Sequence, residues 1–180
     1  MNAHATSIVD PGAAVADDVE IGPFCVVGPR VRLGAGCRLV ARVIITGNVT
    51  VGLRNTFHPN AAIGGAPQSS EPAAADGRIE IGDDNVFREG SAVHLSASPG
   101  GATRIGSKNV FHAFATVGYD CEIGNGVVVG PFAGLGGHTV VGDGARIDGS
   151  GGTGEHVTLA PGSRLESHVK READPAGGAP

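Results

Sequence analysis

The chain has 180 residues, including 31 glycines, 11 prolines, three cysteines and no tryptophan, and this length fits one domain. So much glycine argues against a helical bundle, because each glycine inside a helix costs about 1 kcal/mol relative to alanine. The formal net charge of −5 gives no electrostatic footprint for nucleic acid, and no apolar run is long enough to span a membrane. The N-terminus lacks a signal-peptide pattern and the cysteines form no Cys-x-x-Cys pair, so we expect a cytoplasmic protein.

A six-residue repeat runs through most of the chain. Large aliphatic or phenylalanine side chains recur at every sixth position from Val9 to Ile63, from Ile81 to Val93 and from Ile105 to Ile147. Glycine often follows directly, and a small or β-branched residue or asparagine stands four positions after the aliphatic one. This is the hexapeptide pattern of a parallel β-helix, in which three units close one triangular coil. The sequence therefore predicts an all-β solenoid domain over residues 1–170.

Two stretches interrupt the repeat, and the chain ends without it. Residues 64–78 (GGAPQSSEPAAADGR) and residues 94–104 (HLSASPGGATR) are rich in proline, serine and glycine. We expect both to form loops that project from the solenoid, and long loops in compact domains are often functional. Residues 171–180 are charged and rich in proline and glycine, so we expect a disordered tail there.

The residue before each aliphatic position points outward, so outward residues 18 positions apart stack on one wall of the predicted prism. Two outward columns are apolar, one made of Ile8, Val26, Ile44 and Ala62 and the other of Val110 and Val128. Apolar walls that stay in register indicate association. We expect a homotrimer with parallel solenoid axes, because such an assembly closes the contact symmetrically.

Polar residues stack in the same register. Asp120, His138 and His156 share the third position after the aliphatic residue, so neighbours should lie ~5 Å apart. His94 and His112 are also 18 residues apart, although the second loop lies between them and makes their register uncertain. Two interpretations stay open: solvated turn residues, or a polar site between subunits. Metal binding is less favoured, because coils ~5 Å apart are loosely spaced for ligands ~2.1 Å from zinc.

Several motifs go beyond a generic hexapeptide repeat. They are IGPFCVVGP (21–29), FHPNAAIGGAPQ (57–68), EIGDDNVFRE (80–89), TRIGSKN (103–109) and ATVGYDC (115–121). Together they resemble the UDP-N-acetylglucosamine O-acyltransferase family of lipid A biosynthesis, over about residues 5–150. The resemblance implies a left-handed solenoid, a cytoplasmic trimer, and metal-free transfer of a hydroxyacyl chain from acyl carrier protein to a sugar nucleotide in clefts between subunits.

The sequence departs from this family at the catalytic motif. The family writes Ala-His-x-Ala-His-Asp-Cys, so the resemblance implies that Tyr119 replaces the base and that Asp120 remains as the orienting acid. His94 and His138 match two further family histidines. In the first loop, Glu71 stands where the family has a lysine near phosphate, and we expect no C-terminal helical domain. We therefore expect the chain to fail to acylate UDP-N-acetylglucosamine.

We predict an acyltransferase-like, repurposed enzyme that acts on a small or thioester-linked substrate in a cleft between subunits. The predicted catalytic residues are His138, Asp120, Tyr119, His94 and His112, and the predicted substrate-binding residues are Gln68, Arg88 and His156. We expect no metal or cofactor, with an acyl carrier protein or coenzyme A thioester as the candidate co-substrate. The clustered titratable groups favour an enzyme. The alternative is an inactive homologue that serves as a binding or scaffold protein.

Overall fold

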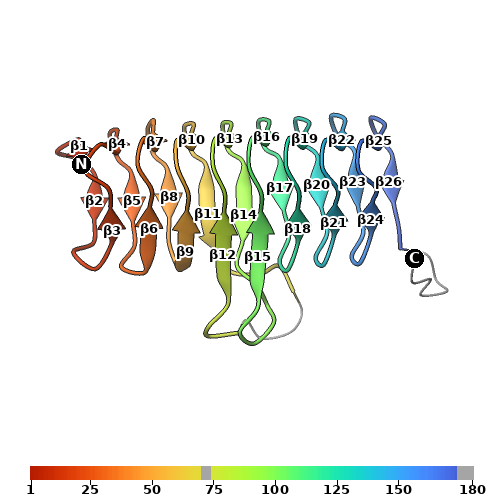
Figure 1. Cartoon of the computed structure of the whole chain (residues 1–180), viewed down its shortest axis with the longest axis horizontal. Coiled ribbons are helices and arrows are strands. Elements are labelled where there is room, and N and C mark those ends of the chain that lie inside the picture. The colour runs from red at the N-terminus through yellow and green to blue at the C-terminus, as the bar shows by residue number, and fades with distance from the viewer. Residues whose placement is uncertain (70–73, 174–180) are drawn as a thin grey trace.

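The computed structural model describes residues 1–69 and 74–173, and every regular element in that part of the chain is a short β-strand. Figure 1 shows these strands as a row of coils that advances from the N-terminus to the C-terminus. The coils build three parallel sheets of nine, nine and eight strands, which we name sheets A, B and C. The predicted all-β solenoid is confirmed.

The strands are assigned to the sheets as follows. Sheet A comprises β1 (Asn2–Ala3), β4 (Glu20–Ile21), β7 (Arg38–Leu39), β10 (Thr56–Phe57), β13 (Val86–Phe87), β16 (Val110–Phe111), β19 (Val128–Val129), β22 (Arg146–Ile147) and β25 (Arg164–Leu165). Sheet B comprises β2 (Ile8–Val9), β5 (Val26–Val27), β8 (Ile44–Ile45), β11 (Ala62–Gly65), β14 (Ala92–His94), β17 (Thr116–Val117), β20 (Gly134–Leu135), β23 (Gly152–Thr153) and β26 (Lys170–Arg171). Sheet C comprises β3 (Ala14–Val15), β6 (Val31–Leu33), β9 (Asn48–Val51), β12 (Arg78–Ile81), β15 (Ala102–Ile105), β18 (Glu122–Ile123), β21 (Val140–Val141) and β24 (Thr158–Leu159).

The aliphatic residue of each repeat fills the interior of the prism. In β7, Arg38 is exposed while the next residue, Leu39, is only 1% exposed, because successive side chains of a strand point to opposite faces. Inside the prism, the rings of Phe57, Phe87 and Phe111 stack with centroids 4.9 and 4.8 Å apart. That spacing is the distance between hydrogen-bonded strands, about 4.8 Å, so each coil covers the core of the next.

Each coil turns at three corners, which we name by the sheets that they join. In the coil that begins at Val110, the AB corner is residues 112–115, the BC corner is 118–121 and the CA corner is 124–127. The third residue of each of these turns has a positive φ, as at Asp120, where φ is 54°. Such angles are uncommon for residues other than glycine. The tight corners therefore restrict which side chains the repeat can carry there.

The two predicted loops project from the same side of the prism, between β11 and β12 and between β14 and β15 (Figure 1). They lengthen two coils: Thr56 pairs with Val86, 30 positions on, and Val86 pairs with Val110, 24 positions on. Other coils repeat after 18 residues, as from Val110 to Val128. The extra residues amount to whole six-residue units, which is why the hydrophobic phase resumes after each loop.

The outer faces of the three sheets differ in charge. From β2 to β23, the outward residues of sheet B are uncharged; they are Ile8, Val26, Ile44, Ala62, Ala92, Thr116, Gly134 and Gly152. The outer faces of the other two sheets include charged residues, such as Arg38 on sheet A and Glu80 and Arg104 on sheet C. The first predicted apolar column lies in register on sheet B, and the pair Val110 and Val128 lies on sheet A.

The remaining expectations concern the ends and the membrane. Arg171, the first residue of the predicted tail, belongs to β26 and pairs with Thr153 of β23. Residues 174–180 lie outside the described residues. Glu71 also lies outside them. Among the described residues, no helix has the length and apolar character needed to cross a membrane.

We expect replacement of Leu39 by alanine to lower the free energy of unfolding far more than replacement of Leu53. Leu39 is 1% exposed inside the prism, whereas Leu53 is 40% exposed at the CA corner. A buried leucine-to-alanine change costs about 2–5 kcal/mol, and an exposed one away from special features costs about 0.5 kcal/mol or less. Urea denaturation followed by far-ultraviolet circular dichroism measures both variants. Equal destabilisation would contradict this assignment of the core.

Candidate active site at one corner of the prism

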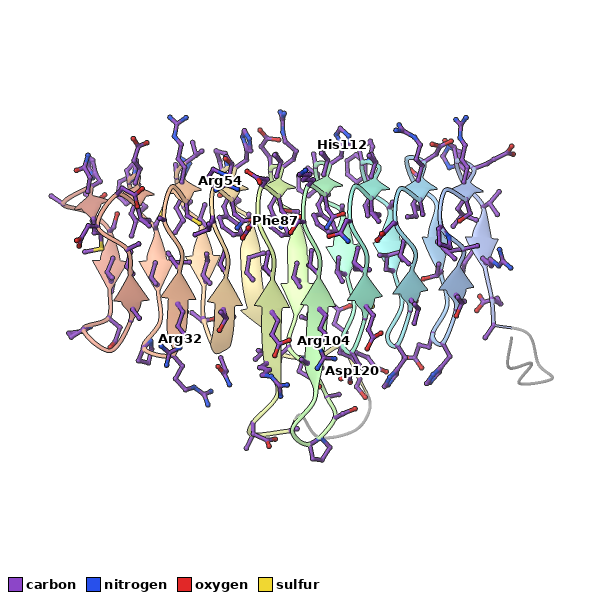
Figure 2. All side chains as sticks on the ribbon, viewed as in Figure 1. Arg32, Arg54, Phe87, Arg104, His112 and Asp120 are labelled. Carbon is purple, nitrogen blue, oxygen red and sulfur yellow. The ribbon has the colours of Figure 1, made fainter. Side chains whose placement is uncertain are left out.

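Most of the predicted site residues gather at the BC corner. These residues lie in or directly after the sheet B strands, or in the first loop: Gln68, His94, Tyr119, Asp120, His138 and His156. In Figure 2, Asp120 lies on the side of the prism from which the loops project, and His112 lies on the opposite side. The corner therefore places titratable side chains from four successive coils beside both loops.

Two predicted residues, Arg88 and His112, lie at the AB corner instead. The second loop lengthens its coil to 24 residues, so Arg88 is level with His112, whereas His94 is level with Gly118. The 18-residue spacing of His94 and His112 therefore does not bring them together within one chain. Any contact between these two residues and the BC corner would require a neighbouring subunit.

Three aromatic rings form a column at the BC corner. The rings of His138 and His156 stack with centroids 4.4 Å apart and planes 4° apart. The ring of Tyr119 meets His138 at its edge, with centroids 5.3 Å apart and planes at 86°. Gly137 makes this packing feasible, because a Cβ there would lie 2.6 Å from Cζ of Tyr119. The column follows from the coil spacing, and it holds the two imidazoles in fixed orientations.

Tyr119 is bound to a residue that the sequence analysis did not select. Its hydroxyl donates a hydrogen bond to Oε1 of Glu155 at 2.5 Å, and Tyr119 is only 7% exposed. The hydrogen bond to Glu155, and then burial, raise the pKa of Tyr119 above its ordinary value, while the Ser69 hydroxyl lowers it in part. The spacing in the sequence could have indicated this contact, because Glu155 follows Tyr119 by 36 residues, which is two coils.

Asp120 anchors the second loop. Its carboxylate accepts hydrogen bonds from the Ser96 hydroxyl, from the Ala97 amide at 3.1 Å, and from the Ser98 amide and hydroxyl at 3.2 and 3.1 Å. The side chain is 9% exposed, and its Oδ2 also lies 3.9 Å from Nε2 of His138. Asp120 therefore combines a structural task with a charge placed beside the imidazole.

His94 lies at the start of the second loop and is 8% exposed. Its Nδ1 lies 2.9 Å from the carbonyl oxygen of Val117, so Nδ1 carries the proton in this contact. The neutral ring then keeps Nε2 as an acceptor. Gly65 leaves space on that side, since an added Cβ would lie 3.6 Å from Cδ2 of His94.

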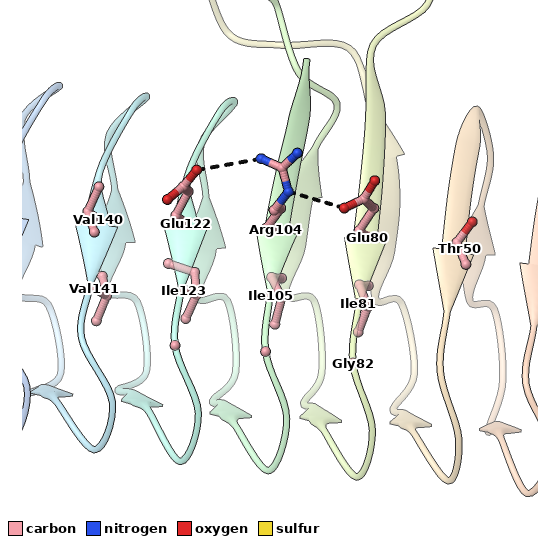
Figure 3. A pocket seen from close by; sticks show the side chains of 12 residues that line it. Thr50, Glu80, Ile81, Gly82, Arg104, Ile105, Glu122, Ile123, Val140 and Val141 are labelled. Atoms are coloured by element: carbon pink, nitrogen blue, oxygen red, sulfur yellow. Dashed lines mark hydrogen bonds and ion pairs between the residues drawn. The ribbon is translucent and has the colours of Figure 1, made fainter. Parts of the chain in front are cut away.

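A shallow groove of about 600 Å³ runs over the outer face of sheet C. Figure 3 shows Arg104 between Glu80 and Glu122 above a row of aliphatic side chains. Nε of Arg104 lies 3.2 Å from Glu80 and Nη1 lies 3.5 Å from Glu122, so these charges pair with one another. The groove reaches the first residues of the CA corner, such as Gly106 and Gly124, and none of the predicted site residues line it.

The donor atoms of the corner do not form a metal site. Within residues 1–69 and 74–173, no group of three or more histidine, cysteine, aspartate or glutamate side chains is placed to hold a metal ion. Cys121 lies beside Asp120, but burial raises the pKa of its thiol to about 12. The imidazole of His138 beside the carboxylate of Asp120 is a pair of groups suited to proton transfer.

Comparison with known proteins places the fold among hexapeptide acyltransferases. Residues 102–137 match the family described as bacterial transferase hexapeptide (six repeats). The chain is 40% identical over 122 residues to the acyl-[acyl-carrier-protein]–UDP-N-acetylglucosamine O-acyltransferase of Syntrophobacter fumaroxidans, covering 67% of this chain and 47% of that protein. It is 41% identical over 118 residues to the Akkermansia muciniphila enzyme of the same name, covering 66% and 46%. The chain thus spans about half the length of these relatives.

Solved structures agree. The UDP-N-acetylglucosamine acyltransferase of Francisella novicida superposes with a TM-score of 0.82 at 29% identity, covering 90% of this chain and 62% of that one. The Campylobacter jejuni enzyme gives a TM-score of 0.85 at 24% identity, covering 91% and 64%, and supports the fold alone. These matches confirm the left-handed parallel β-helix. The chain is an acyltransferase-like hexapeptide-repeat protein that resembles the UDP-N-acetylglucosamine O-acyltransferases.

Proposed function

We propose that the BC corner is the active site of an acyltransferase that moves an acyl group from a carrier thioester to the hydroxyl of a small acceptor. The observation that carries this proposal is the placement of His138. Its imidazole is 34% exposed, and its Nε2 lies 3.9 Å from the carboxylate of Asp120. A partly exposed base beside a buried carboxylate, on an acyltransferase-like fold, suits proton transfer to and from a bound substrate.

One imidazole can carry the proton through the whole reaction. Nε2 of His138 takes the proton of the acceptor hydroxyl as that oxygen attacks the thioester carbonyl carbon. The tetrahedral intermediate then collapses, the carbon–sulfur bond breaks, and the imidazolium returns the proton to the leaving thiolate. Asp120 stabilises the imidazolium by its negative charge. A positioned general base of this kind contributes a factor of ~10²–10⁴ to the rate. His94, with Nε2 as acceptor, is the second candidate for the base.

Tyr119 supports this site as a hydrogen-bond donor and not as a base. Its ordinary pKa is near 10, and the contact with Glu155 and burial raise that pKa further. At neutral pH the phenol is therefore protonated and holds the Glu155 carboxylate in place. Among the exposed predicted residues, Gln68 and His156 lie at the same corner and are suited to binding the substrate.

The relatives are named for UDP-N-acetylglucosamine, but we propose a smaller acceptor for this chain. The reason is the corner itself, where Tyr119 occupies the position at which the resembled family has its catalytic histidine. The hydroxyl of that tyrosine donates its proton in a hydrogen bond to Glu155. It therefore does not replace the histidine that the resembled family uses as its base. The acyl donor that we propose is a thioester of acyl carrier protein or of coenzyme A.

A scaffold role is the second candidate, and one observation favours it. The carboxylate of Asp120 accepts hydrogen bonds from Ser96, Ala97 and Ser98 of the second loop. A corner whose acid holds a loop would also suit a protein that binds a partner without turnover. The two functions differ in what removal of the His138 imidazole does.

We expect His138→Ala to lower kcat by about 100-fold or more, because it removes the general base. The assay measures thiol release from acyl-coenzyme A with UDP-N-acetylglucosamine and with small hydroxyl compounds as acceptors. His94→Asn tests the second candidate, and His168→Ala, an exposed imidazole far along the chain, is the matched control. Robust transfer to UDP-N-acetylglucosamine would contradict the smaller acceptor. Absence of turnover with every acceptor, together with unchanged thioester binding in His138→Ala, would favour the scaffold.

We expect Tyr119 to titrate above pH 10 in the folded protein. The chain has one tyrosine and no tryptophan, so the tyrosinate absorbance reports this residue alone. Because its folded pKa is raised, the stabilisation from its hydrogen bond is complete below pH ~10 and is lost as the pH rises through the folded value. Glu155→Gln should lower the midpoint toward the value of the urea-unfolded chain. An identical midpoint in both folded proteins would show that Glu155 does not hold the phenol.

A further inference from the structure

Two arginines near the N-terminal end of sheet C lie close together without a carboxylate partner. Arg32 is the central residue of β6 and Arg30 directly precedes that strand; both are exposed. Within residues 1–69 and 74–173, neither forms an ion pair. Elsewhere on the same sheet, Arg78 and Arg104 both pair with Glu80. The two charges at β6 are therefore available to an anion from outside the chain.

The strand register explains why these arginines have no acidic partner. Arg32 is paired with Ala14 of β3 on one side and with Thr50 of β9 on the other. Arg30 lies beside Asn48, because the next residues of these two segments are paired. The neighbouring strands thus offer a methyl group, a hydroxyl and an amide, whereas the later coils of sheet C place glutamates beside arginine.

A proline turn brings Arg30 to this position. Gly28, Pro29, Arg30 and Val31 form a turn in which the Val31 amide donates to the carbonyl oxygen of Gly28 at 3.2 Å. Proline suits the second position of such a turn, because its ring fixes φ near −65°. The φ of Arg30 is not positive, unlike that of Asp120 at the equivalent place in a later BC corner. This corner is therefore built differently from those of the proposed active site.

A pocket of about 300 Å³ lies between the two arginines and the neighbouring coils. Its lining combines the proline turn with small and polar neighbours: Gly12, Ala14, Pro29, Arg30, Val31, Arg32 and Asn48. Gly12 keeps the first coil close to the turn, because an added Cβ would lie 3.0 Å from the carbonyl oxygen of Pro29. The volume is at the lower end of the range for small-molecule sites.

The local charge favours an anion although the chain as a whole does not. The formal net charge is −5, so the overall field repels anions. Asp10 is an acid near the pocket, but its Oδ1 accepts a hydrogen bond from the Gly12 amide at 2.8 Å and the residue does not line the pocket. Arg30 and Arg32 are two positions apart along the chain, or about 6.6 Å in an extended segment. Each guanidinium offers a planar fork of donors that matches phosphate oxygens.

We propose that this pocket binds the diphosphate group of a small molecule. Arg30 and Arg32 each contact one phosphate, and the side-chain amide of Asn48 donates to an oxygen between them. The pocket lies four coils from Asp120 along the axis, or about 19 Å at about 4.8 Å per coil. In Figure 2, Arg32 lies on the side of the prism from which the loops project. The site is separate from the proposed reaction and does not rest on it.

Calorimetric titration with inorganic pyrophosphate tests the site. At 150 mM sodium chloride, exposed charges farther apart than about 8 Å are largely screened, so binding reports the local pocket. Arg30→Ala and Arg32→Ala should each weaken the affinity by about 10-fold or more, since each removes charge-assisted hydrogen bonds. Arg42→Ala is the matched control, because Arg42 is exposed at the AB corner and does not line the pocket; it should leave the affinity unchanged.

Two further titrations define the ligand. Inorganic phosphate should bind at least about 10-fold more weakly than pyrophosphate, because one phosphate cannot contact both guanidinium groups in this way. ADP carries the same diphosphate on a nucleoside, so tighter binding of ADP would identify a nucleotide ligand, and equal or weaker binding would identify the free diphosphate. In either case Arg32→Ala should weaken binding.

Three results would overturn the proposal. They are no binding of pyrophosphate by the wild-type protein, equal weakening by Arg42→Ala and Arg32→Ala, and equal affinity for phosphate and pyrophosphate. Both arginines are exposed and lack ion pairs with the described residues, so their replacement should leave the thermal midpoint of the unliganded protein unchanged. Circular dichroism checks that midpoint, and an unchanged value assigns any loss of affinity to the pocket.

Discussion

Every coil must hydrogen-bond in register to the coils on either side, at about 4.8 Å, and the rest of the structure depends on this constraint. A residue in one coil therefore lies over the residue at the same position of the next coil. The interior shows the effect in polar form as well. At the CA corner, Asn85 donates to Oδ1 of Asn55 at 2.9 Å, and the Asn109 amide donates to Oδ1 of Asn85 at 2.9 Å. The buried Oδ1 atoms of Asn55 and Asn85 are thus each satisfied by the next repeat.

The same constraint divides the tasks at the BC corner. Stacking fixes the imidazole of His138 between Tyr119 and His156, and it brings the phenol of Tyr119 to Glu155 two coils away. Asp120 holds the second loop against the prism. Residue types that proton-transfer chemistry uses therefore also serve the scaffold here, and the proposed reaction assigns the general base to the imidazole of His138 or of His94.

The sequence predicted the fold well because a six-residue period states directly which side chains point inward. It also placed Asp120, His138 and His156 in one column, where no loop intervenes and each coil has 18 residues. It could not place His112 relative to His94, because a spacing of 18 ignores the six residues that the second loop adds to its coil. The contact of Tyr119 with Glu155 and the loop contacts of Asp120 depend on side-chain reach across coils, which a linear period does not express.

The way in which the two loops join the prism has a consequence for how such proteins diversify. Each loop leaves one strand and re-enters the next at the same corner, and the coils before and after it remain paired as they would be without it. The length and sequence of either loop can therefore vary without disturbing the strand register elsewhere. Selection can therefore change the loops beside the proposed site while the packed coils continue to provide the stability of the fold. Substrate preference and folding can then evolve independently on this scaffold.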